Sequence, residues 1–217
     1  GKDWVRMNTG NTSAINAIHF VNQLTGWYTG NSSEIRKTTD GGATWVQQSF
    51  GVGSGNNDIW FKDLNNGFVI GNNGILRKTT NGGGTWQTIA SGVTVSLRKI
   101  LFANNNLGFI ACSNGQVLRT TDGGNTWNII TTGAGGINDI FFADANTGYL
   151  SSSNNLYKTN DGGLTWNPVS TGATYPILRI FFVDANTGYL SVGGEGIYKT
   201  NNGGLTWNNT TTLNGLY

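Results

Sequence analysis

An eight-residue phrase that ends in tryptophan recurs along the whole chain at nearly constant spacing. Its copies occupy residues 38–45, 79–86, 120–127, 159–166 and 200–207, and their tryptophans are 41, 41, 39 and 41 residues apart. Self-similarity at a period of this size indicates a repeat architecture, in which each repeat packs on its neighbours. The chain is therefore predicted to form one cooperative domain, residues 1–217.

Each repeat contains four strand-like segments. The first is a run of β-branched and aromatic residues that ends in phenylalanine, at residues 15–20, 56–61, 97–102, 137–142 and 177–182. Because this run is nearly continuous rather than alternating, we expect a strand that is buried on both faces. The second segment opens at a Gly-aromatic pair, the third precedes the phrase, and the fourth begins at its tryptophan.

Polar turns rich in Asn, Asp and Gly separate these segments. The turn before the second segment is clearest at residues 144–148 and 184–188, and its glycine precedes Trp27, Phe68, Phe109, Tyr149 or Tyr189. Asn, Asp and Gly tolerate the left-handed backbone that a tight reversal demands, and we expect the glycine to serve that purpose.

Four short antiparallel strands in each repeat of about 41 residues are typical of a β-propeller blade. Helical repeats are excluded, because no apolar pattern recurs with a helical period and Gly, Asn and Thr disfavour helix interiors. We predict an all-β propeller with five blades of four antiparallel strands, at residues 14–50, 55–91, 96–132, 136–171 and 176–212.

Residues 4–9 resemble a fourth strand without a blade of its own, since Trp4 lies 41 residues before Trp45. We expect this strand to lie on the last blade and to help close the ring. It would either displace the fourth strand of that blade, at residues 206–212, or lie outside it as a fifth strand. The remaining alternative is that the chain forms a segment of a larger propeller.

The recurring phrase is similar to the Asp-box pattern, Ser/Thr-x-Asp-x-Gly-x-Thr-Trp. With its flanking residues, as in Arg36-Lys37-Thr38-Thr39-Asp40-Gly41-Gly42, it resembles the Ycf48-like, or BNR/Asp-box, propeller repeat over essentially the whole chain. This resemblance implies contact with proteins, since the photosynthetic members assist the assembly of a membrane complex. Asp boxes also occur in sialidases, sortilin-like receptors and xyloglucanases, so the repeat class implies no single activity.

The third position of the phrase is expected to stabilise the turn. A carboxylate or amide there can accept hydrogen bonds from backbone amides, and the tryptophan is expected to cap the gap between neighbouring blades. A metal site is not expected, because one such side chain per blade does not supply converging ligands. These structural residues are Asp40, Asn81, Asp122, Asp161 and Asn202, with Trp45, Trp86, Trp127, Trp166 and Trp207.

Composition limits the partners that the chain can take. Only 11% of the residues are charged and the net charge is +2, so neither a polybasic surface for nucleic acid nor an acidic tail is present. No apolar run is long enough to span a bilayer. The sequence starts at Gly1 without a positively charged and apolar leader, so we expect that a secretion signal has been removed or is not included. The low charge and the richness in Asn, Thr and Gly predict a secreted, periplasmic or cell-surface protein of a bacterium. No cofactor is expected.

Candidate ligand residues lie near the start of the first strands, at positions where the residue type differs from repeat to repeat. One register holds Ala17, Asp58, Lys99, Asp139 and Arg179, and the preceding register holds Asn16, Asn57, Arg98, Asn138 and Leu178. With Glu34 and Glu195 on nearby turns, these residues are expected at the mouth of the central channel, on the face opposite the Asp boxes. They either solvate the channel and pair with one another or bind a small ligand or a peptide.

Hydrolytic activity requires groups that the sequence does not readily bring together. A sialidase needs three converging arginines, whereas Arg36, Arg77 and Arg119 occupy one phase of three successive third strands. A glycosidase needs two carboxyl groups roughly 5 to 9.5 Å apart, and Asp58 with Asp139 is the candidate pair. The arginines are expected to form a solvated outer edge, or a contact for an acidic partner, with Lys37, Lys78, Lys158 and Lys199.

His19 and Cys112 are the only histidine and the only cysteine. In the other repeats His19 is replaced by large apolar residues and Cys112 by small ones. We therefore expect His19 to lie in the core and Cys112 to be a buried, unreactive thiol.

The predicted function is that of a non-enzymatic binding or assembly scaffold, which engages a protein partner through the face opposite the Asp-box turns. The alternative is a lectin-like propeller with repeated equivalent glycan sites between its blades, and a glycoside hydrolase is a weaker alternative. A lectin should repeat its contact residues in every blade, whereas the channel-mouth register varies from Ala17 to Asp58 to Lys99. This variation favours docking of a protein through one asymmetric surface.

Overall fold

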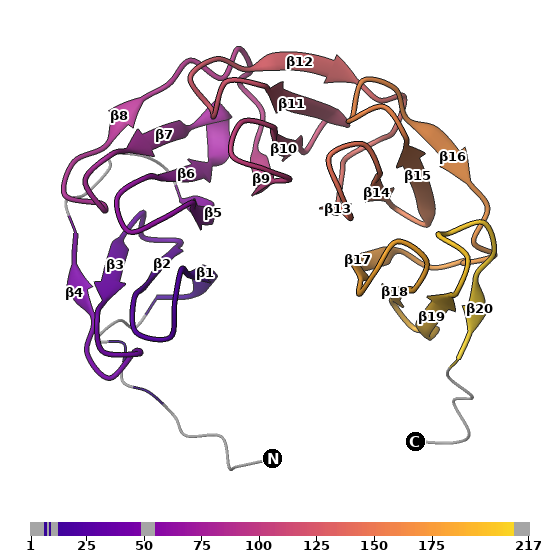
Figure 1. Cartoon of the computed structure of the whole chain (residues 1–217), viewed down its shortest axis with the longest axis horizontal. Coiled ribbons are helices and arrows are strands. Elements are labelled where there is room, and N and C mark those ends of the chain that lie inside the picture. The colour runs from indigo at the N-terminus through magenta and orange to yellow at the C-terminus, as the bar shows by residue number, and fades with distance from the viewer. Residues whose placement is uncertain (1–6, 8, 10–12, 49–54, 211–217) are drawn as a thin grey trace. The chain divides into compact units, whose positions relative to one another are not determined.

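The computed structural model describes residue 7, residue 9, residues 13–48 and residues 55–210. These residues form five sheets of four antiparallel strands, and in each sheet the strands lie side by side in chain order (Figure 1). The described part holds one short helix, the 3-10 turn η1 (Asn72–Gly74). The predicted all-β architecture of five four-stranded blades is confirmed.

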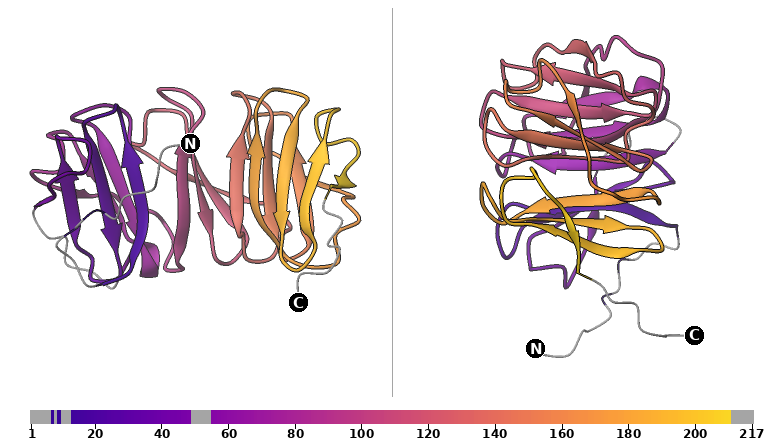
Figure 2. Two further views of the ribbon diagram at one scale, coloured as in Figure 1. Left: turned by 90° about the horizontal axis from the view of Figure 1, so that it is seen from below. Right: turned by 90° about the vertical axis from the view of Figure 1, so that its right-hand side faces the viewer.

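The strands follow the sequence four to a blade, and Figures 1 and 2 show the last four of them side by side. The first strands have the predicted bounds except in blade four, where β13 starts at Asp139. The strands are β1 (Ile15–Phe20), β2 (Gly26–Gly30), β3 (Ile35–Thr38) and β4 (Val46–Gln47) in blade one; β5 (Asn56–Phe61), β6 (Gly67–Gly71), β7 (Leu76–Thr79) and β8 (Gln87–Thr88) in blade two; β9 (Leu97–Phe102), β10 (Gly108–Cys112), β11 (Gln116–Thr120) and β12 (Asn128–Thr131) in blade three; β13 (Asp139–Phe142), β14 (Gly148–Ser152), β15 (Asn155–Thr159) and β16 (Asn167–Val169) in blade four; and β17 (Ile177–Phe182), β18 (Gly188–Val192), β19 (Gly196–Thr200) and β20 (Asn208–Asn209) in blade five.

The chain divides into two compact units, residues 1–100 and residues 101–217, and the boundary falls within β9. The first unit contains blades one and two, and the second contains blades four and five with most of blade three. The expectation of one cooperative domain stays a prediction. The expected closing strand at residues 4–9 lies outside the described residues, apart from Met7 and Thr9.

The second strand, not the first, is the most deeply buried strand of a blade. Every residue of β2, β6, β10 and β14 is buried. In the first strands β5 and β17 half of the residues are accessible, and β1 has no buried residue. The expectation of a first strand buried on both faces is therefore wrong. The reason is that the first strand forms an edge of its sheet, whereas the second strand has a neighbour on each side.

The glycine that precedes each second-strand aromatic residue is required by a ring and not by a turn. A Cβ atom on Gly26 would lie 2.6 Å from the Phe20 ring, and one on Gly148 would lie 2.7 Å from the Phe142 ring. Neither glycine has the positive φ that favours glycine in tight turns. The expectation of a left-handed backbone at these glycines is wrong, because the last phenylalanine of the first strand occupies the space of their missing side chains.

Stacked aromatic rings join successive blades within each unit. We name the two faces of a blade after these rings: the trailing face carries the second-strand aromatic residue, and the leading face carries the last phenylalanine of the first strand. Trp27 of blade one stacks on Phe61 of blade two with ring centroids 3.6 Å apart and planes 5° from parallel. Tyr149 of blade four stacks on Phe182 of blade five at 4.2 Å and 14°.

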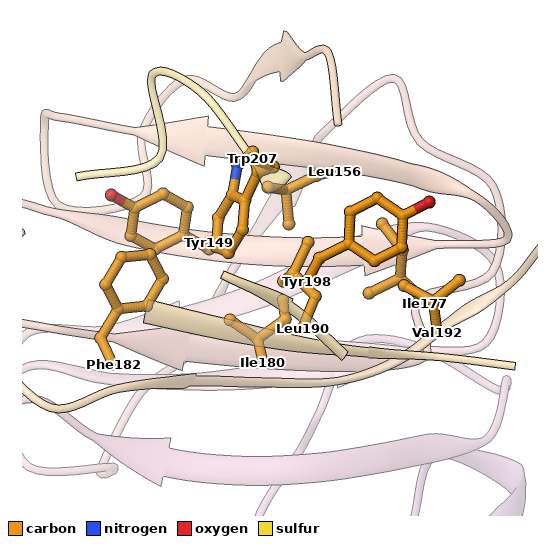
Figure 3. Packing of buried hydrophobic residues seen from close by; sticks show 9 residues of the cluster. All are labelled: Tyr149, Leu156, Ile177, Ile180, Phe182, Leu190, Val192, Tyr198 and Trp207. Atoms are coloured by element: carbon orange, nitrogen blue, oxygen red, sulfur yellow. The ribbon is translucent and has the colours of Figure 1, made fainter. Parts of the chain in front are cut away.

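The joint between blades four and five shows how the core is built (Figure 3). Tyr149 and Leu156 of blade four pack in one buried cluster with residues of blade five. Within that cluster the Asp-box residue Trp207 meets the Phe182 ring edge-on, with centroids 5.8 Å apart and planes at 84°. Burying large aromatic surfaces is the main favourable term in such a joint. The contribution of blade five is Ile177, Ile180, Phe182, Leu190, Val192, Tyr198 and Trp207.

Candidate functional site

Each blade has two ends with different chemistry. At the box end the third strand leads into the Asp box, which lies beside the turn between the first and second strands, as the 2.8 Å bond from Gly41 N to Leu24 O shows. At the other end, which we call the start end, the first strand begins beside the turn between the second and third strands, as the pairing of Ile15 with Gly30 shows. The predicted ligand residues lie at the start ends of their blades.

The Asp box is a closed set of local hydrogen bonds. In blade one, Asp40 Oδ1 accepts bonds from Thr44 N at 2.9 Å and Thr38 Oγ1 at 2.8 Å, and Thr44 Oγ1 donates to Asp40 Oδ2 at 2.6 Å. Thr38 Oγ1 in turn accepts a bond from Gly42 N at 2.9 Å. The Thr44 hydroxyl, with the other donors, lowers the pKa of Asp40 to about 2. The hydroxyl of Thr165 does the same for Asp161, whose pKa also falls to about 2.

The boxes with asparagine keep this geometry by reversing the direction of one hydrogen bond to a threonine hydroxyl. Asn81 Oδ1 accepts bonds from Thr85 N at 2.9 Å and Thr79 Oγ1 at 3.0 Å, as the carboxylate does in blade one. At the remaining position Asn81 Nδ2 donates to Thr85 Oγ1 at 2.9 Å, so the threonine hydroxyl becomes an acceptor. A hydroxyl can donate or accept as its partner requires. The box therefore needs a side-chain oxygen at this position but not a negative charge.

The box end also ties neighbouring blades together through a glycine carbonyl of the boxes in blades two, four and five. Gly82 O in blade two accepts a bond from Trp27 Nε1 of blade one at 3.0 Å. Gly203 O in blade five accepts bonds from Tyr149 Oη and Lys158 Nζ of blade four, both at 2.8 Å. Gly162 O in blade four accepts a bond from Arg119 Nε of blade three at 2.6 Å. These acceptors are used within the fold, which gives the box end a structural role.

The third-strand cations are part of these joints, and their expected arrangement as a solvated outer edge is wrong. Lys37 Nζ lies 5.0 Å from the centroid of the Trp27 ring, and Lys158 Nζ lies 5.4 Å from that of Tyr149. Arg77 is buried. The reason is that the third strand pairs with the aromatic second strand, so a long cationic side chain lies across the ring beside it.

Asp58 and Asp139 connect adjacent blades at the start end. Asp58 Oδ1 accepts a bond from Ile59 N at 2.9 Å, and its Oδ2 accepts one from Ile100 N on the next blade, also at 2.9 Å. Asp139 is buried and makes the same pair of bonds, with Ile140 N at 3.0 Å and Ile180 N at 2.7 Å. Each carboxylate thus holds the first strands of two blades in register.

The asparagines of the preceding register make a second link of this kind. Asn57 Nδ2 donates to Leu97 O of blade three at 2.8 Å, and Asn138 Nδ2 donates to Ile177 O of blade five at 3.2 Å. Asn16 Nδ2 donates to Asn56 O of blade two at 2.7 Å. Four of the predicted ligand residues, Asn57, Asp58, Asn138 and Asp139, are therefore bonded to the backbone of a neighbouring blade.

The basic residues of the same registers are more accessible. Arg98 and Arg179 are exposed and Lys99 is half-buried. Arg179 Nη1 donates to the carbonyl of Leu178 at 2.7 Å, which holds the guanidinium group near the start of β17. Whether any of these residues binds a ligand stays a prediction.

Glu34 lies in a buried polar cluster of blade one. Arg36 Nε lies 2.6 Å from Glu34 Oε1, and Tyr28 Oη lies 3.1 Å from the same oxygen. The carbonyl of Thr9 accepts bonds from Tyr28 Oη and Arg36 Nη1, both at 3.0 Å. Burial raises the pKa of Tyr28. Because Glu34 is buried beside a cation, its charge is compensated locally, and Arg36 takes no part in a group of converging arginines.

Glu195 organises an accessible patch at the start end of blade five. Its carboxylate accepts bonds from the amide and hydroxyl of Thr174 and from Tyr198 Oη at 3.0 Å. The Thr174 hydroxyl is the largest influence that lowers the pKa of Glu195. Tyr175 and Leu178 lie against Gly194 and Gly193 of the same turn. Both residues and the neighbouring Arg179 are exposed. We call Thr174, Tyr175, Leu178, Arg179 and Glu195 the blade-five patch.

Sequence reasoning did not select Tyr175, although the sequence carries a signal for it. The equivalent position, two residues before the first strand, holds Ser13, Ser54, Val95 and Gly135 in the other repeats. Tyr175 is the one aromatic residue among them, and its ring lies over Gly194, whose backbone has a φ of +77°. A large exposed ring at a position that is otherwise small or aliphatic indicates a contact surface.

The isolated histidine and cysteine do not form a reactive site. His19 is half-buried, and burial lowers its pKa. Cys112 is fully buried, and burial raises the pKa of its thiol to about 12. Among the described residues no three His, Cys, Asp or Glu side chains are grouped so that they could hold a metal ion. In the same residues no helix has the length and apolarity to span a membrane.

One protein family matches the chain in sequence. The model of the family described as photosynthesis system II assembly factor YCF48 matches residues 1–90 and residues 50–135. No curated protein sequence matches the chain.

Solved propellers resemble the chain in fold. The structure of YCF48 bound to D1 peptide is 21% identical with a TM-score of 0.77, and the match covers 94% of this chain and 70% of that one. YCF48 from Cyanidioschyzon merolae is 19% identical with a TM-score of 0.61, covering 90% and 84%. An ancestral GH74 enzyme is 19% identical with a TM-score of 0.79, covering 96% of this chain and 32% of the enzyme. At these identities the likeness concerns the fold alone.

Proposed function

Because this chain belongs to the family of the photosystem II assembly factor Ycf48, we propose that it is a non-enzymatic scaffold that binds a segment of a partner protein at the start ends of its blades. The observation that carries the proposal is the blade-five patch, where the exposed Tyr175 and Leu178 lie against the turn that carries Glu195 and Arg179 is exposed next to Leu178 in the same strand. Ycf48 itself is similar in fold, and its solved structure is of the protein bound to a D1 peptide.

The patch has the composition of a peptide contact. Tyrosine supplies a large rigid ring at a low cost in conformational entropy, and arginine supplies a fixed fork of donors. The Thr174 bonds hold the carboxylate of Glu195, and the Leu178 carbonyl holds the guanidinium of Arg179. Such preorganisation reduces the entropy that a bound peptide has to overcome.

The chemistry of the box end supports the choice of the start end. The box carboxylates and amides bond to their own turns, and the glycine carbonyls of the boxes in blades two, four and five accept bonds from the neighbouring blade. Few polar groups of the box remain for a partner. At the start end the residues differ from blade to blade, which suits an asymmetric protein ligand better than a repeated glycan.

The environment of Asp58 and Asp139 supports a role without catalysis. Both carboxylates accept bonds from two backbone amides, so their lone pairs serve the fold rather than a substrate. General acid or base catalysis requires a carboxyl group that can exchange a proton with a substrate. The GH74 likeness adds no support for hydrolysis, because it concerns the fold alone.

The test measures binding of a fluorescent D1 peptide to the full chain by anisotropy. We expect saturable binding, a rise in Kd of about tenfold or more for Tyr175→Ala, and a smaller rise for Arg179→Ala. Leu205→Ala is the matched control, because Leu205 is exposed in the Asp box of the same blade; its Kd should stay within about twofold. Binding that is lost in the control but kept in Tyr175→Ala would place the site at the box end.

A second measurement extends the test beyond one peptide. An array of overlapping peptides and a glycan array are probed with the same protein and with Tyr175→Ala. Peptide signals that the substitution weakens support the proposal. Saturable binding to a defined sugar with no peptide signal would replace it with the glycan-binding alternative.

A further inference from the structure

The chain contains several Asn-Gly dipeptides, in which the asparagine is chemically labile. The backbone nitrogen of the following residue can attack the side-chain carbonyl carbon, and glycine has no side chain to obstruct the attack. The fold sets the rate, because the nitrogen has to leave its own hydrogen bond and the carboxamide has to lie against it. Among the described residues these dipeptides occupy positions 66–67, 73–74, 81–82, 114–115 and 202–203.

The two dipeptides that belong to Asp boxes are held in place at both reacting groups. Gly82 N donates to Asn65 O at 2.8 Å, and Gly203 N donates to Asn186 O at 2.9 Å. Each box asparagine makes three hydrogen bonds through its carboxamide within its own box. Attack by the glycine nitrogen would therefore require the box to open, and the box protects its asparagine.

Blade two also holds its remaining two dipeptides. Gly67 belongs to β6, which pairs with a strand on each side. Gly74 N donates to Val95 O, in the segment between β8 and β9, at 2.7 Å. A short bond of this kind keeps the nitrogen away from the preceding side chain.

The dipeptide at residues 114–115 lies in the turn between β10 and β11, and its glycine nitrogen is held less firmly. Gly115 N donates to Cys112 O at 3.3 Å, which is longer than the usual range for such a bond. Asn114 is exposed. Its carboxamide bonds to Gln116, whose N donates to Asn114 Oδ1 at 3.2 Å and whose Oε1 accepts a bond from Asn114 Nδ2 at 2.8 Å.

These bonds fold the Asn114 side chain over the nitrogen that would attack it. An asparagine oxygen that accepts a bond from the amide two residues later forms an Asx turn, and the side chain then curls over the peptide unit between them. That peptide unit contains Gly115 N. The Gln116 amide also donates to the oxygen that becomes negative when the nitrogen adds to the carbonyl carbon, and it stabilises this charge.

The fold requires the glycine that makes Asn114 reactive. Gly115 has a φ of +86°, which favours glycine. A Cβ atom at this position would lie 2.1 Å from Ala134 O. No residue with a side chain fits here, so the turn cannot shield Asn114 by a bulkier neighbour.

We propose that Asn114 is a site of spontaneous deamidation in the folded chain. Gly115 N forms a bond to Cγ of Asn114, the bond between Cγ and Nδ2 breaks, and Nδ2 leaves as ammonia with the proton of the Gly115 amide. Water then opens the cyclic imide at either carbonyl carbon, which gives aspartate or isoaspartate. No atom is oxidised or reduced, and water is the co-reactant.

The modification changes both the charge and the backbone of the start end of blade three. Either product adds a negative charge to a chain whose net charge is +2. Isoaspartate also adds a carbon atom to the main chain of the turn. Because the buried Thr132 Oγ1 donates to Gly115 O at 2.6 Å, the longer turn displaces a carbonyl that the blade uses.

The first experiment compares two asparagines of the native chain. The full chain is incubated in a mildly alkaline buffer at physiological temperature and digested with trypsin, and mass spectrometry measures the deamidated fraction of each peptide over time. Asn114, in the peptide of residues 100–119, should react at least about tenfold faster than Asn81, in the peptide of residues 79–98. Equal rates, or a faster reaction at Asn81, would overturn the proposal.

The second experiment separates the effect of the fold from that of the local sequence. The same incubation is carried out in guanidinium chloride, where both dipeptides are unfolded. Unfolding should accelerate the reaction of Asn81 at least about tenfold and that of Asn114 by no more than about threefold, because the box has to open and the exposed turn does not. An equal acceleration at the two positions would show that the turn protects Asn114 as the box protects Asn81, contrary to the proposal.

The third experiment assigns the modified residue. Aged native chain and aged Asn114→Gln are treated with an isoaspartyl methyltransferase and a labelled methyl donor before digestion. Label in the peptide of residues 100–119 should fall at least about tenfold in the variant, because glutamine has to close a larger and less favourable ring. That peptide also contains Asn104, Asn105 and Asn106. Label that persists in Asn114→Gln would place the reaction at one of these residues and overturn the proposal.

Discussion

Asp139 of blade four accepts a 2.7 Å hydrogen bond from the backbone amide of Ile180 in blade five, so one buried side chain fixes the first strands of two sheets. A buried donor that loses its acceptor keeps the full cost of its desolvation. The residues at the start end that vary most between repeats thus include two that link neighbouring blades.

Replacing Asp139 should destabilise the protein more than replacing its counterpart in blade five. Asp139→Ala removes the acceptor for Ile140 N and Ile180 N and should lower the free energy of unfolding by about 1 to 3 kcal/mol. Urea denaturation measures this change. Arg179→Ala at the same register is the control, and its exposed side chain should cost within about 0.5 kcal/mol. Equal losses in the two variants would contradict the link.

The loss of stability on removing the last phenylalanine of a first strand should depend on how deeply its ring is buried. Phe61→Ala removes the ring that stacks on Trp27 and should cost about 3 to 5 kcal/mol. Phe20→Ala makes the same change at the same position of blade one, where the ring is partly exposed, and should cost less than half as much. The comparison uses thermal or urea unfolding at low protein concentration. A larger loss of unfolding free energy for Phe20→Ala would mean that burial does not determine how much each ring contributes to stability.

The glycine before the second-strand aromatic residue should not accept a side chain. Gly148→Ala places a methyl group 2.7 Å from the Phe142 ring and should cost about 1 to 3 kcal/mol through displacement of that ring. Gly193→Ala is the control, since its Cβ would have contacts no closer than 3.7 Å. Unfolding free energies of the two variants decide the matter, and similar values would refute the steric explanation.

The acidic Asp boxes should make stability depend on pH below about 4. An ordinary aspartate has a pKa of about 3.9, and the box hydrogen bonds lower the pKa of Asp40 and Asp161 to about 2. A depressed pKa in the folded state stabilises the protein above the ordinary value, and this stability is lost as the pH falls through the folded value. The melting temperature should therefore drop between about pH 4 and pH 2.

Charge-neutral boxes provide the control for this pH dependence. Asp40→Asn/Asp161→Asn should show a smaller drop in melting temperature over the same range, because an amide keeps the bonds that Asn81 makes. Asn81→Asp/Asn202→Asp should show a larger drop. A double asparagine variant with the native slope would mean that other carboxylates cause the effect, and Asp144 and Asp184, whose pKa values are also lowered, would be the next to test.

The periodicity of the sequence predicted the blades well because each repeat forms its hairpins from local signals. The Trp spacing and the phenylalanine at the end of each first strand placed four of the five first strands at their observed bounds. What could not be predicted were particular side-chain contacts, both within a blade and between blades. Nothing local to Gly148 indicates that a phenylalanine of the same blade fills its space, and nothing local to Lys158 indicates that it reaches Gly203.

The candidate site was predicted less well for a related reason. Variation between repeats drew attention to the start end. At this register, however, the carboxylates of Asp58 and Asp139 accept a bond from a backbone amide of the next blade. Lys99 and Arg179, at the same register, have no side-chain acceptor for such a bond. Irregularity along a repeat has two causes, ligand contact and alternative packing, which only the geometry separates. Tyr175 also differs from its counterparts in the other repeats, but it lies outside the strands. Because its ring is exposed, packing within the blade explains the difference less well.

The division of each joint between two blades has a consequence for how such chains change length. A core is completed by the trailing face of one blade and the leading face of the next, as Tyr149 and Phe182 show. Duplicating or deleting one whole repeat therefore restores a matched joint at the new border without further substitutions. A chain built in this way can gain or lose blades in single genetic events, and only its two terminal faces have to adapt.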